Sequence, residues 1–296
     1  MFTGLCAFPL TPLKDENIDE CAFINIMQRL AKSSVNSIGV LGSTGNYAYL
    51  SRQERDLIVK LAVEHSGKVP LIAGISGLRL RDVLLYAENA QRHGVEALLL
   101  APMSYQKLSE REVFRLYEQV NKEISIPLCV YDNPSTTQFV FSDELMRDIA
   151  QLSHVQSIKI PPISLDLQAA QARINELRDT LPQDVTLGIS GDGFATTGIL
   201  AGCDAWYSVT AGLFPESMSK LFSLASNGSQ QEADTLNRVY EPLWSLFDQY
   251  GSLRVIATAA EILGHTQSPC LPLPLMTLPA FDRDMLAKML HLLRLD

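Results

Sequence analysis

The stretch VQSIKIPPIS, which runs from Val155 to Ser164, begins as a short apolar strand and ends after two prolines. Strand alternation would place Val155, Ser157 and Lys159 on one face and two isoleucines on the other. A lysine is seldom buried without a partner, so Lys159 should either reach solvent or serve a function. A short strand that is largely apolar on both faces is typical of a parallel sheet covered by helices.

Similar apolar runs recur along the chain and alternate with segments whose apolar residues lie three or four positions apart. Two of these segments begin with a capping box, at 51–54 and 109–112. Eight β/α units at a spacing of roughly 30 residues predict a closed (β/α)8 barrel. An open doubly wound sheet ranks lower, because the sequence has no Gly-x-Gly-x-x-Gly turn and no P-loop. The expected strands are 4–8, 37–41, 71–74, 97–101, 128–131, 155–160, 186–189 and 205–209.

The part of the chain after the last expected strand reads as helical throughout. We expect residues 1–214 to hold the barrel strands and their helices. Residues 215–296 should then form the last barrel helix and a C-terminal helical extension, since one barrel needs less helix than this.

The composition is that of a globular protein, with 47% hydrophobic and 19% charged residues. A net charge of −9 without blocks of like charge argues against nucleic acid or an anionic membrane as a partner. The five cysteines are widely spaced and include no C-x-x-C pair, which indicates reduced thiols. No apolar stretch reaches the roughly 18 residues that cross a bilayer, so we expect a cytoplasmic protein. No metal is expected, because ligand spacing is lacking among His65, His93, His154, His265 and His291.

In such barrels the active site lies at the carboxyl ends of the strands. Four of the expected strand ends carry polar residues: GSTG at 42–45, PMSY at 102–105, YDNP at 131–134, and Lys159. Each has an ordinary structural interpretation, as a turn, a packed tyrosine ring or a lysine that extends to solvent. Their coincidence at one end of one barrel favours catalysis.

Together these groups fit Schiff-base catalysis on a small 2-oxo acid. A neutral lysine amine attacks a ketone carbonyl, and the hydroxyl of Tyr131 can move the protons that imine formation releases and requires. The hydroxyls and backbone N–H groups of the GSTG turn suit a small carboxylate, such as that of pyruvate.

The order and spacing of these motifs resemble those of the pyruvate-dependent class I aldolases and lyases, which include dihydrodipicolinate synthase and N-acetylneuraminate lyase. The resemblance covers nearly the whole chain, through FPLTPLKDENID (8–19), GSTG, YDNP, the strand lysine, SGDG (190–193) and SVTAG (208–212). It implies pyruvate and an aldehyde as substrates, and a covalent imine on lysine in place of a cofactor. It also implies a homotetramer built as a dimer of dimers.

The resemblance further implies a role for each residue that matches a family motif. Lys159 would form the Schiff base, and Tyr131 would donate and accept protons. Ser43 would link Tyr131 to Tyr105 of a neighbouring subunit in a proton relay. The substrate-binding residues would be Thr44 for the pyruvate carboxylate, Tyr207 through its backbone carbonyl, Gly191 and Thr136.

Several positions depart from the family pattern. Dihydrodipicolinate synthases carry an arginine where this chain has Thr136, and threonine lacks the bidentate grip of a guanidinium on a carboxylate. N-acetylneuraminate lyases carry an acidic pair where this chain has Asp192 and Gly193. The other departures are Asn46 in place of glutamate, and Pro161 and Pro162 in place of polar residues.

These departures leave the aldehyde open. One alternative is an aldolase or dehydratase for 2-keto-3-deoxy sugar acids, or an N-acetylneuraminate-type aldolase. A protein of a different class, a non-catalytic homologue that binds a keto acid, would not need a lysine nucleophile together with a proton relay.

Overall fold

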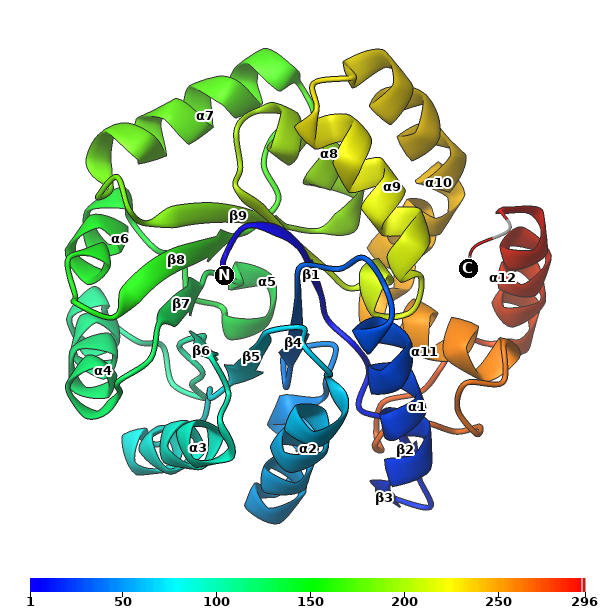
Figure 1. Ribbon diagram of the computed structural model, residues 1–296, viewed down its shortest axis with the longest axis horizontal. Helices are drawn as coiled ribbons and strands as arrows, with labels where there is room; N and C mark the ends of the chain where they lie inside the picture. The colour runs from blue at the N-terminus through cyan, green and yellow to red at the C-terminus, as the bar shows by residue number, and fades with distance from the viewer. Residues whose placement is uncertain (294, 296) are drawn as a thin grey trace.

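The computed structural model describes residues 1–293 and 295, and its centre is a closed barrel of eight parallel strands (Figure 1). The barrel closes because its first strand, β1, pairs both with the next barrel strand, β4, and with the last, β10. This confirms the predicted (β/α)8 class. The barrel strands are β1 (Gly4–Ala7), β4 (Ser37–Val40), β5 (Leu71–Gly74), β6 (Ala97–Leu100), β7 (Leu128–Tyr131), β8 (Val155–Ile160), β9 (Thr186–Ser190) and β10 (Ala205–Ser208).

Helices surround the barrel, and an antiparallel hairpin of β2 (Leu13–Lys14) and β3 (Asn17–Ile18) stands apart from it. Two short 3₁₀ helices, η1 (Tyr47–Tyr49) and η2 (Thr210–Gly212), follow strands β4 and β10. The helices are α1 (Glu20–Ala31), α2 (Arg52–His65), α3 (Leu80–His93), α4 (Glu110–Glu123), α5 (Pro134–Thr137), α6 (Asp143–Ala150), α7 (Leu167–Thr180), α8 (Asp192–Leu200), α9 (Pro215–Ser226), α10 (Gln230–Tyr250), α11 (Ser252–Ile262) and α12 (Ala280–Leu293).

Both predicted capping boxes are present at the starts of α2 and α4. The Ser51 and Ser109 side chains each accept a hydrogen bond from the backbone N–H of a glutamate three residues later. The carboxylate of that glutamate accepts a hydrogen bond from the backbone N–H of the serine. These bonds satisfy backbone donors that the first turn leaves without partners. Helix α4 then buries Val113, Tyr117 and Val120 along one stripe.

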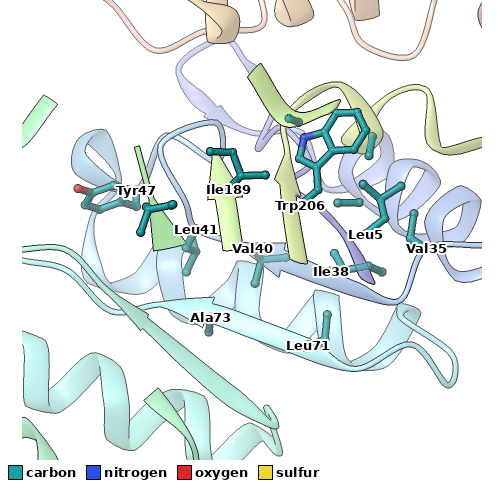
Figure 2. Close-up of a cluster of buried hydrophobic side chains, with 14 of the residues drawn as sticks. Leu5, Val35, Ile38, Val40, Leu41, Tyr47, Leu71, Ala73, Ile189 and Trp206 are labelled. Atoms are coloured by element: carbon teal, nitrogen blue, oxygen red, sulfur yellow. The ribbon is translucent and has the colours of Figure 1, made fainter. Parts of the chain in front are cut away.

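Apolar side chains pack in two regions that the strands separate. The larger region lies between the strands and the helices, where Leu5, Ile38, Leu71 and Trp206 meet (Figure 2). The smaller region fills the barrel, and its members are Phe2, Cys6, Phe8, Ile72, Ala97, Leu99, Ala101, Cys129, Tyr131, Ala205 and Tyr207. Side chains on alternate positions of one strand therefore serve different cores.

Strand β8 departs from simple alternation at its start. The register with β7 shifts between Leu128 and Cys129, so that Val155 pairs with the first and Ser157 with the second. Because of this irregularity Val155 belongs to the outer core, and the prediction that it shares a face with Lys159 was wrong. Ser157 and Lys159 remain on one side of the strand, beside Cys129 and Tyr131 of the inner core.

Helices α9 to α12 follow η2, as predicted, but residues 263–279 between α11 and α12 are not helical, so the prediction of an entirely helical segment was wrong there. Helix α9 packs against β1 and α8, and α10 packs against α8, α9, α11 and α12. The carboxylate of Glu261 on α11 is buried and pairs with Arg283 on α12 at 2.5 Å. Within residues 1–293 and 295, no helix is both long and apolar enough to cross a membrane.

Candidate active site

A cavity of about 1270 Å³ opens at the carboxyl ends of the barrel strands. Its wall includes Ser43, Thr44, Tyr131 and Lys159, which come from three strand ends that are far apart in the sequence. Helix α10 and the start of α11 form much of the outer wall. The predicted reactive groups and the helices α10 and α11 thus line one cavity, which the sequence did not predict.

Lys159 lies at the end of β8 with only 5% of its surface exposed. Its register partner on the neighbouring strand is Tyr131. The ammonium nitrogen Nζ lies 4.0 Å from the ring centroids of Phe8 and Tyr131, and 5.4 Å from that of Tyr207. The ion pairs of the described residues do not include Lys159. Three aromatic rings therefore surround the amine.

The thiols near Lys159 add no negative charge. Burial raises the pKa of Cys6 to about 12, and it also raises the pKa of Cys129. Both groups stay neutral at ordinary pH. They line the barrel interior with Tyr207, whose hydroxyl oxygen lies 2.8 Å from Ser157 Oγ.

Three polar side chains meet around the hydroxyl of Tyr131. The Tyr131 oxygen lies 3.5 Å from Ser43 Oγ. The side-chain amide of Asn133 donates to the Tyr131 oxygen at 2.9 Å and to Ser43 Oγ at 3.3 Å. Asn133 stands within the YDNP motif, but no pattern in the sequence predicted a role for it.

The loop after β4 places Thr44 in the cavity wall. Leu41 and Asn46 at its two ends adopt left-handed backbone conformations, with φ of 56° and 57°. Asn46 is buried and donates to the backbone carbonyl of Thr11 at 3.1 Å. The hydrogen bond of Asn46 therefore holds the loop in place, while Thr44 lines the same cavity as Lys159.

Gly191 lies at the junction of β9 and α8, and two features require a glycine there. Its φ is +86°, and a Cβ at this position would lie 2.7 Å from Cγ of Pro162. Pro162, which follows the lysine strand, therefore packs directly on the Gly191 backbone. Both residues line the cavity.

Asp192 lies at the start of α8 and lines the cavity, but its carboxylate already accepts hydrogen bonds from within the protein. It accepts hydrogen bonds from Trp206 Nε1 at 2.8 Å and from the backbone N–H of Thr210 at 2.8 Å. Only 3% of its surface is exposed, and burial raises its pKa. Asp192 thus supports the barrel rim, and binding of a sugar hydroxyl would require breaking these bonds.

Among the described residues, the cations other than Lys159 that line the cavity lie on its outer wall. Arg238 on α10 and Arg254 on α11 both line it. Their guanidinium groups donate to the backbone carbonyls of Asp234 at 3.3 Å and Tyr250 at 3.2 Å. Trp244 lines the same wall, and its Nε1 donates to Asn237 Oδ1 at 3.0 Å.

Two predicted site residues lie apart from this cluster. Tyr105 is 92% exposed in the loop after β6, and it is absent from the described wall of the cavity. Thr136 lines the cavity, but its hydroxyl donates to the backbone carbonyl of Asn133 at 3.3 Å. The role of Tyr105 stays a prediction that depends on a neighbouring subunit.

A lysine and a tyrosine on adjacent strand ends of a closed (β/α)8 barrel define an aldolase-type lyase. The model of the dihydrodipicolinate synthetase family matches residues 1–293. The chain belongs to the dihydrodipicolinate synthetase family, as its resemblance predicted. It is thus an enzyme of the class I aldolase type.

Similar proteins match this chain over nearly all of its length and of theirs. The crystal structure of dihydrodipicolinate synthase from Agrobacterium tumefaciens has 40% identity and a TM-score of 0.95, and it covers 99% of this chain and 98% of that chain. A 4-hydroxy-tetrahydrodipicolinate synthase of Sulfurihydrogenibium is 27% identical over 294 residues, 98% of both chains. Another from Archaeoglobus fulgidus is 29% identical over 276 residues, 92% of both.

Proposed function

We propose that the protein forms a Schiff base between Lys159 and pyruvate, and joins the resulting enamine to an aldehyde or releases it in the reverse reaction. The observation that carries this proposal is the pairing of Lys159 with Tyr131, whose ring centroid lies 4.0 Å from Nζ, at the mouth of one cavity. No cofactor is needed, because the protonated imine that Lys159 forms with pyruvate is itself the electron sink.

The reaction proceeds in balanced steps. The neutral amine attacks the keto carbon of pyruvate, and the carbonyl oxygen leaves as water after it takes protons through Tyr131. Loss of a C3 proton then gives the enamine, which forms a carbon–carbon bond with the aldehyde as the aldehyde oxygen takes up a proton. Water finally hydrolyses the imine and restores Lys159.

We assign the pyruvate carboxylate to the loop after β4. Thr44 and Ser43 line the cavity there, and their hydroxyl and backbone N–H groups can donate to carboxylate oxygens. Gly191, with Pro162 packed on it, borders the cavity, and Tyr207 lies beneath the amine. These roles follow from the family match and from the place of each residue around Lys159.

The aldehyde is the part of the proposal on which the chain departs from its named relatives. Relatives are named 4-hydroxy-tetrahydrodipicolinate synthase. This chain has Thr136 where the family resemblance places an arginine, and that hydroxyl donates to the Asn133 backbone carbonyl. Among the described residues, Arg238 and Arg254 are the cations of the outer cavity wall, which we call the acceptor side because the aldehyde would bind there. They favour an acceptor with an anionic group, such as a semialdehyde that carries a carboxylate.

The Schiff base is tested by reduction with borohydride in the presence of pyruvate. We expect one stable adduct per chain, which mass spectrometry of peptides locates on Lys159. Lys159→Arg retains the positive charge but removes the nucleophile, so it should give no adduct. A wild-type protein that binds pyruvate without an adduct would instead be the non-catalytic homologue.

The acceptor is tested by a panel of aldehydes with and without a distal carboxylate. We expect activity with carboxylated acceptors, and Arg254→Gln should raise their KM by roughly 10-fold while aldehydes that lack a carboxylate are unaffected. If aspartate semialdehyde proves the best acceptor, our interpretation of Thr136 is wrong.

Assembly and location complete the proposal. We propose a homotetramer in the cytoplasm, on the basis of the family match and of the five cysteines, which are all free thiols.

A further inference from the structure

The Tyr131 hydroxyl has a hydrogen-bond partner from its own chain that is nearer than Ser43. Asn133 Nδ2 lies 2.9 Å from the Tyr131 oxygen, whereas Ser43 Oγ lies 3.5 Å from it. The same amide nitrogen lies 3.3 Å from Ser43 Oγ. The three groups therefore form a closed triangle at the wall of the cavity.

The donor count of an amide explains this triangle. The side-chain nitrogen of asparagine carries two hydrogens and has no acceptor site. Asn133 donates to Tyr131 and to Ser43, so both hydroxyl oxygens accept from it. Each hydroxyl keeps its own hydrogen for a neighbour or for the substrate.

The residues after Asn133 hold it in this orientation. Ser135 Oγ donates to the Asn133 side-chain oxygen at 2.9 Å, which leaves the nitrogen to face the two hydroxyls. Thr136 and Thr137 donate through their hydroxyls to the Asn133 backbone carbonyl, at 3.3 and 3.0 Å. The segment that has Thr136 in place of the arginine of the family pattern thus supports Asn133.

We propose that Asn133 is the positioning residue of the proton relay, and that it takes from within the chain the place that the family resemblance gives to Tyr105. The proposal rests on the proposed function of Lys159 and Tyr131. Asn133 acts through Tyr131: its N–H fixes the phenol oxygen toward the cavity and stabilises the negative charge that develops when the phenol gives up its proton. Tyr105 is 92% exposed and has no such contact within the described chain.

The test uses the exchange of pyruvate methyl hydrogens for deuterium, followed by proton NMR in heavy water. This exchange requires the imine and the enamine but no aldehyde, so it does not depend on the unidentified acceptor. We expect Asn133→Leu to slow the exchange roughly 10- to 100-fold, with the half-saturating pyruvate concentration changed less than about threefold. Tyr105→Phe should slow it less than Asn133→Leu does.

A matched control separates this role from a general loss of stability. Asn121 also bridges two groups, since it donates to Ser153 Oγ at 3.2 Å and accepts from the backbone N–H of His154 at 2.9 Å. It lies on α4, outside the described wall of the cavity. Asn121→Leu should leave the exchange rate unchanged.

A second variant tests the donated hydrogen itself. Asn133→Asp has the same shape, but its carboxyl can donate to Tyr131 only when protonated, with an ordinary pKa of about 4. The exchange rate of this variant divided by that of the wild type should therefore rise as the pH falls from about 8 to about 5. A purely structural role would give a ratio that does not depend on pH.

The outcomes distinguish the two proposals. If the wild type forms no borohydride adduct, the proposed function fails. If the wild type forms the adduct and exchanges hydrogen, but Asn133→Leu exchanges within about twofold of it, Asn133 is not part of the relay. A larger loss of exchange rate in Tyr105→Phe than in Asn133→Leu would also overturn the inference, because it would show that Tyr105 positions the proton relay.

Discussion

The surroundings of Lys159 suit an amine that must act as a nucleophile. A carboxylate beside a lysine favours the charged ammonium, which cannot attack a carbonyl. Here the rings of Phe8 and Tyr131 lie 4.0 Å from Nζ, and an aromatic ring attracts a cation more weakly than a carboxylate does. The two rings thus hold the amine at the wall of the cavity.

Asp132, the neighbour of the proposed proton carrier, is a buried carboxyl whose charge is costly to the fold. Only 4% of its surface is exposed, and its Oδ1 has no hydrogen-bond partner among the described residues. Burial raises its pKa from 3.8 to about 7, although Arg173 opposes this shift. The folded protein therefore holds this proton at pH values where the unfolded chain has released it, and stability falls as the pH rises between about 4 and 7.

Asp132→Asn should stabilise the protein above neutral pH. At about pH 8 we expect the free energy of unfolding to rise by on the order of 2–4 kcal/mol, because the variant buries no charge. The gain should vanish below about pH 3, where the wild-type carboxyl is protonated in both states. Urea unfolding at several pH values measures this, with the exposed Asp179→Asn as the control. Equal stability of wild type and Asp132→Asn at pH 8 would contradict the prediction.

At the scale of elements, the large side chain of Tyr207 on β10 packs over Gly188 on β9, which has no side chain. Gly188 pairs with Ala205, and a Cβ on Gly188 would lie 2.2 Å from Cε2 of Tyr207. The Tyr207 ring therefore occupies the space that a side chain on β9 would fill. It also packs edge-on against Phe8, which follows β1, beneath Lys159.

Gly188→Ala should displace the Tyr207 ring and destabilise the protein by about 1–3 kcal/mol, as overpacking of a dense core does. Tyr207→Leu in the same chain should recover at least about 1 kcal/mol of that loss, since the smaller side chain leaves room for the new methyl group. Denaturant unfolding of the two single variants and the double variant gives the coupling energy. Strictly additive effects would show that the two residues do not compete for space.

The sequence predicted the parts of this architecture that depend on local pattern. All eight strands and both capping boxes are where apolar runs and Ser-x-x-Glu spacing placed them. The facing of Lys159 and Tyr131 followed from alternation. Alternation failed at Val155, because a register irregularity cannot be read from apolar residues alone.

The remaining parts of the site depend on contacts between distant segments. The partners of Asp192 lie 14 and 18 residues later, and α10 reaches the cavity only through its packing on α8 and α11. The part played by Asn133 depends on the turn of α5, where side-chain hydroxyls hold its backbone. No spacing rule connects these residues, so tertiary packing decides them.

At the scale of the whole molecule, three consecutive loops at the carboxyl end of the barrel expose large apolar side chains. Tyr105 follows β6, Val140 follows β7 and Leu165 follows β8, and all three are mostly exposed. Such neighbouring apolar loops are typical of a surface that pairs with another subunit. They support the proposed homotetramer.

Sedimentation velocity should give a particle of four times 32.7 kDa. Val140→Asp places a charge in the proposed interface and should shift the protein towards smaller species at micromolar concentration. Leu292→Asp on α12 is equally exposed but lies on a different element, and it should leave the assembly unchanged. A wild-type protein that sediments as a single chain would contradict the proposed assembly.

The two tryptophans of the chain differ in what surrounds them. Trp206 is buried in the outer core and bound to Asp192, whereas Trp244 borders the cavity on α10. Fluorescence of Trp244 should therefore respond when a ligand occupies the acceptor side, while Trp206 supplies a steady background. The protein thus carries an intrinsic optical probe of its own binding space, which needs neither a label nor knowledge of the product.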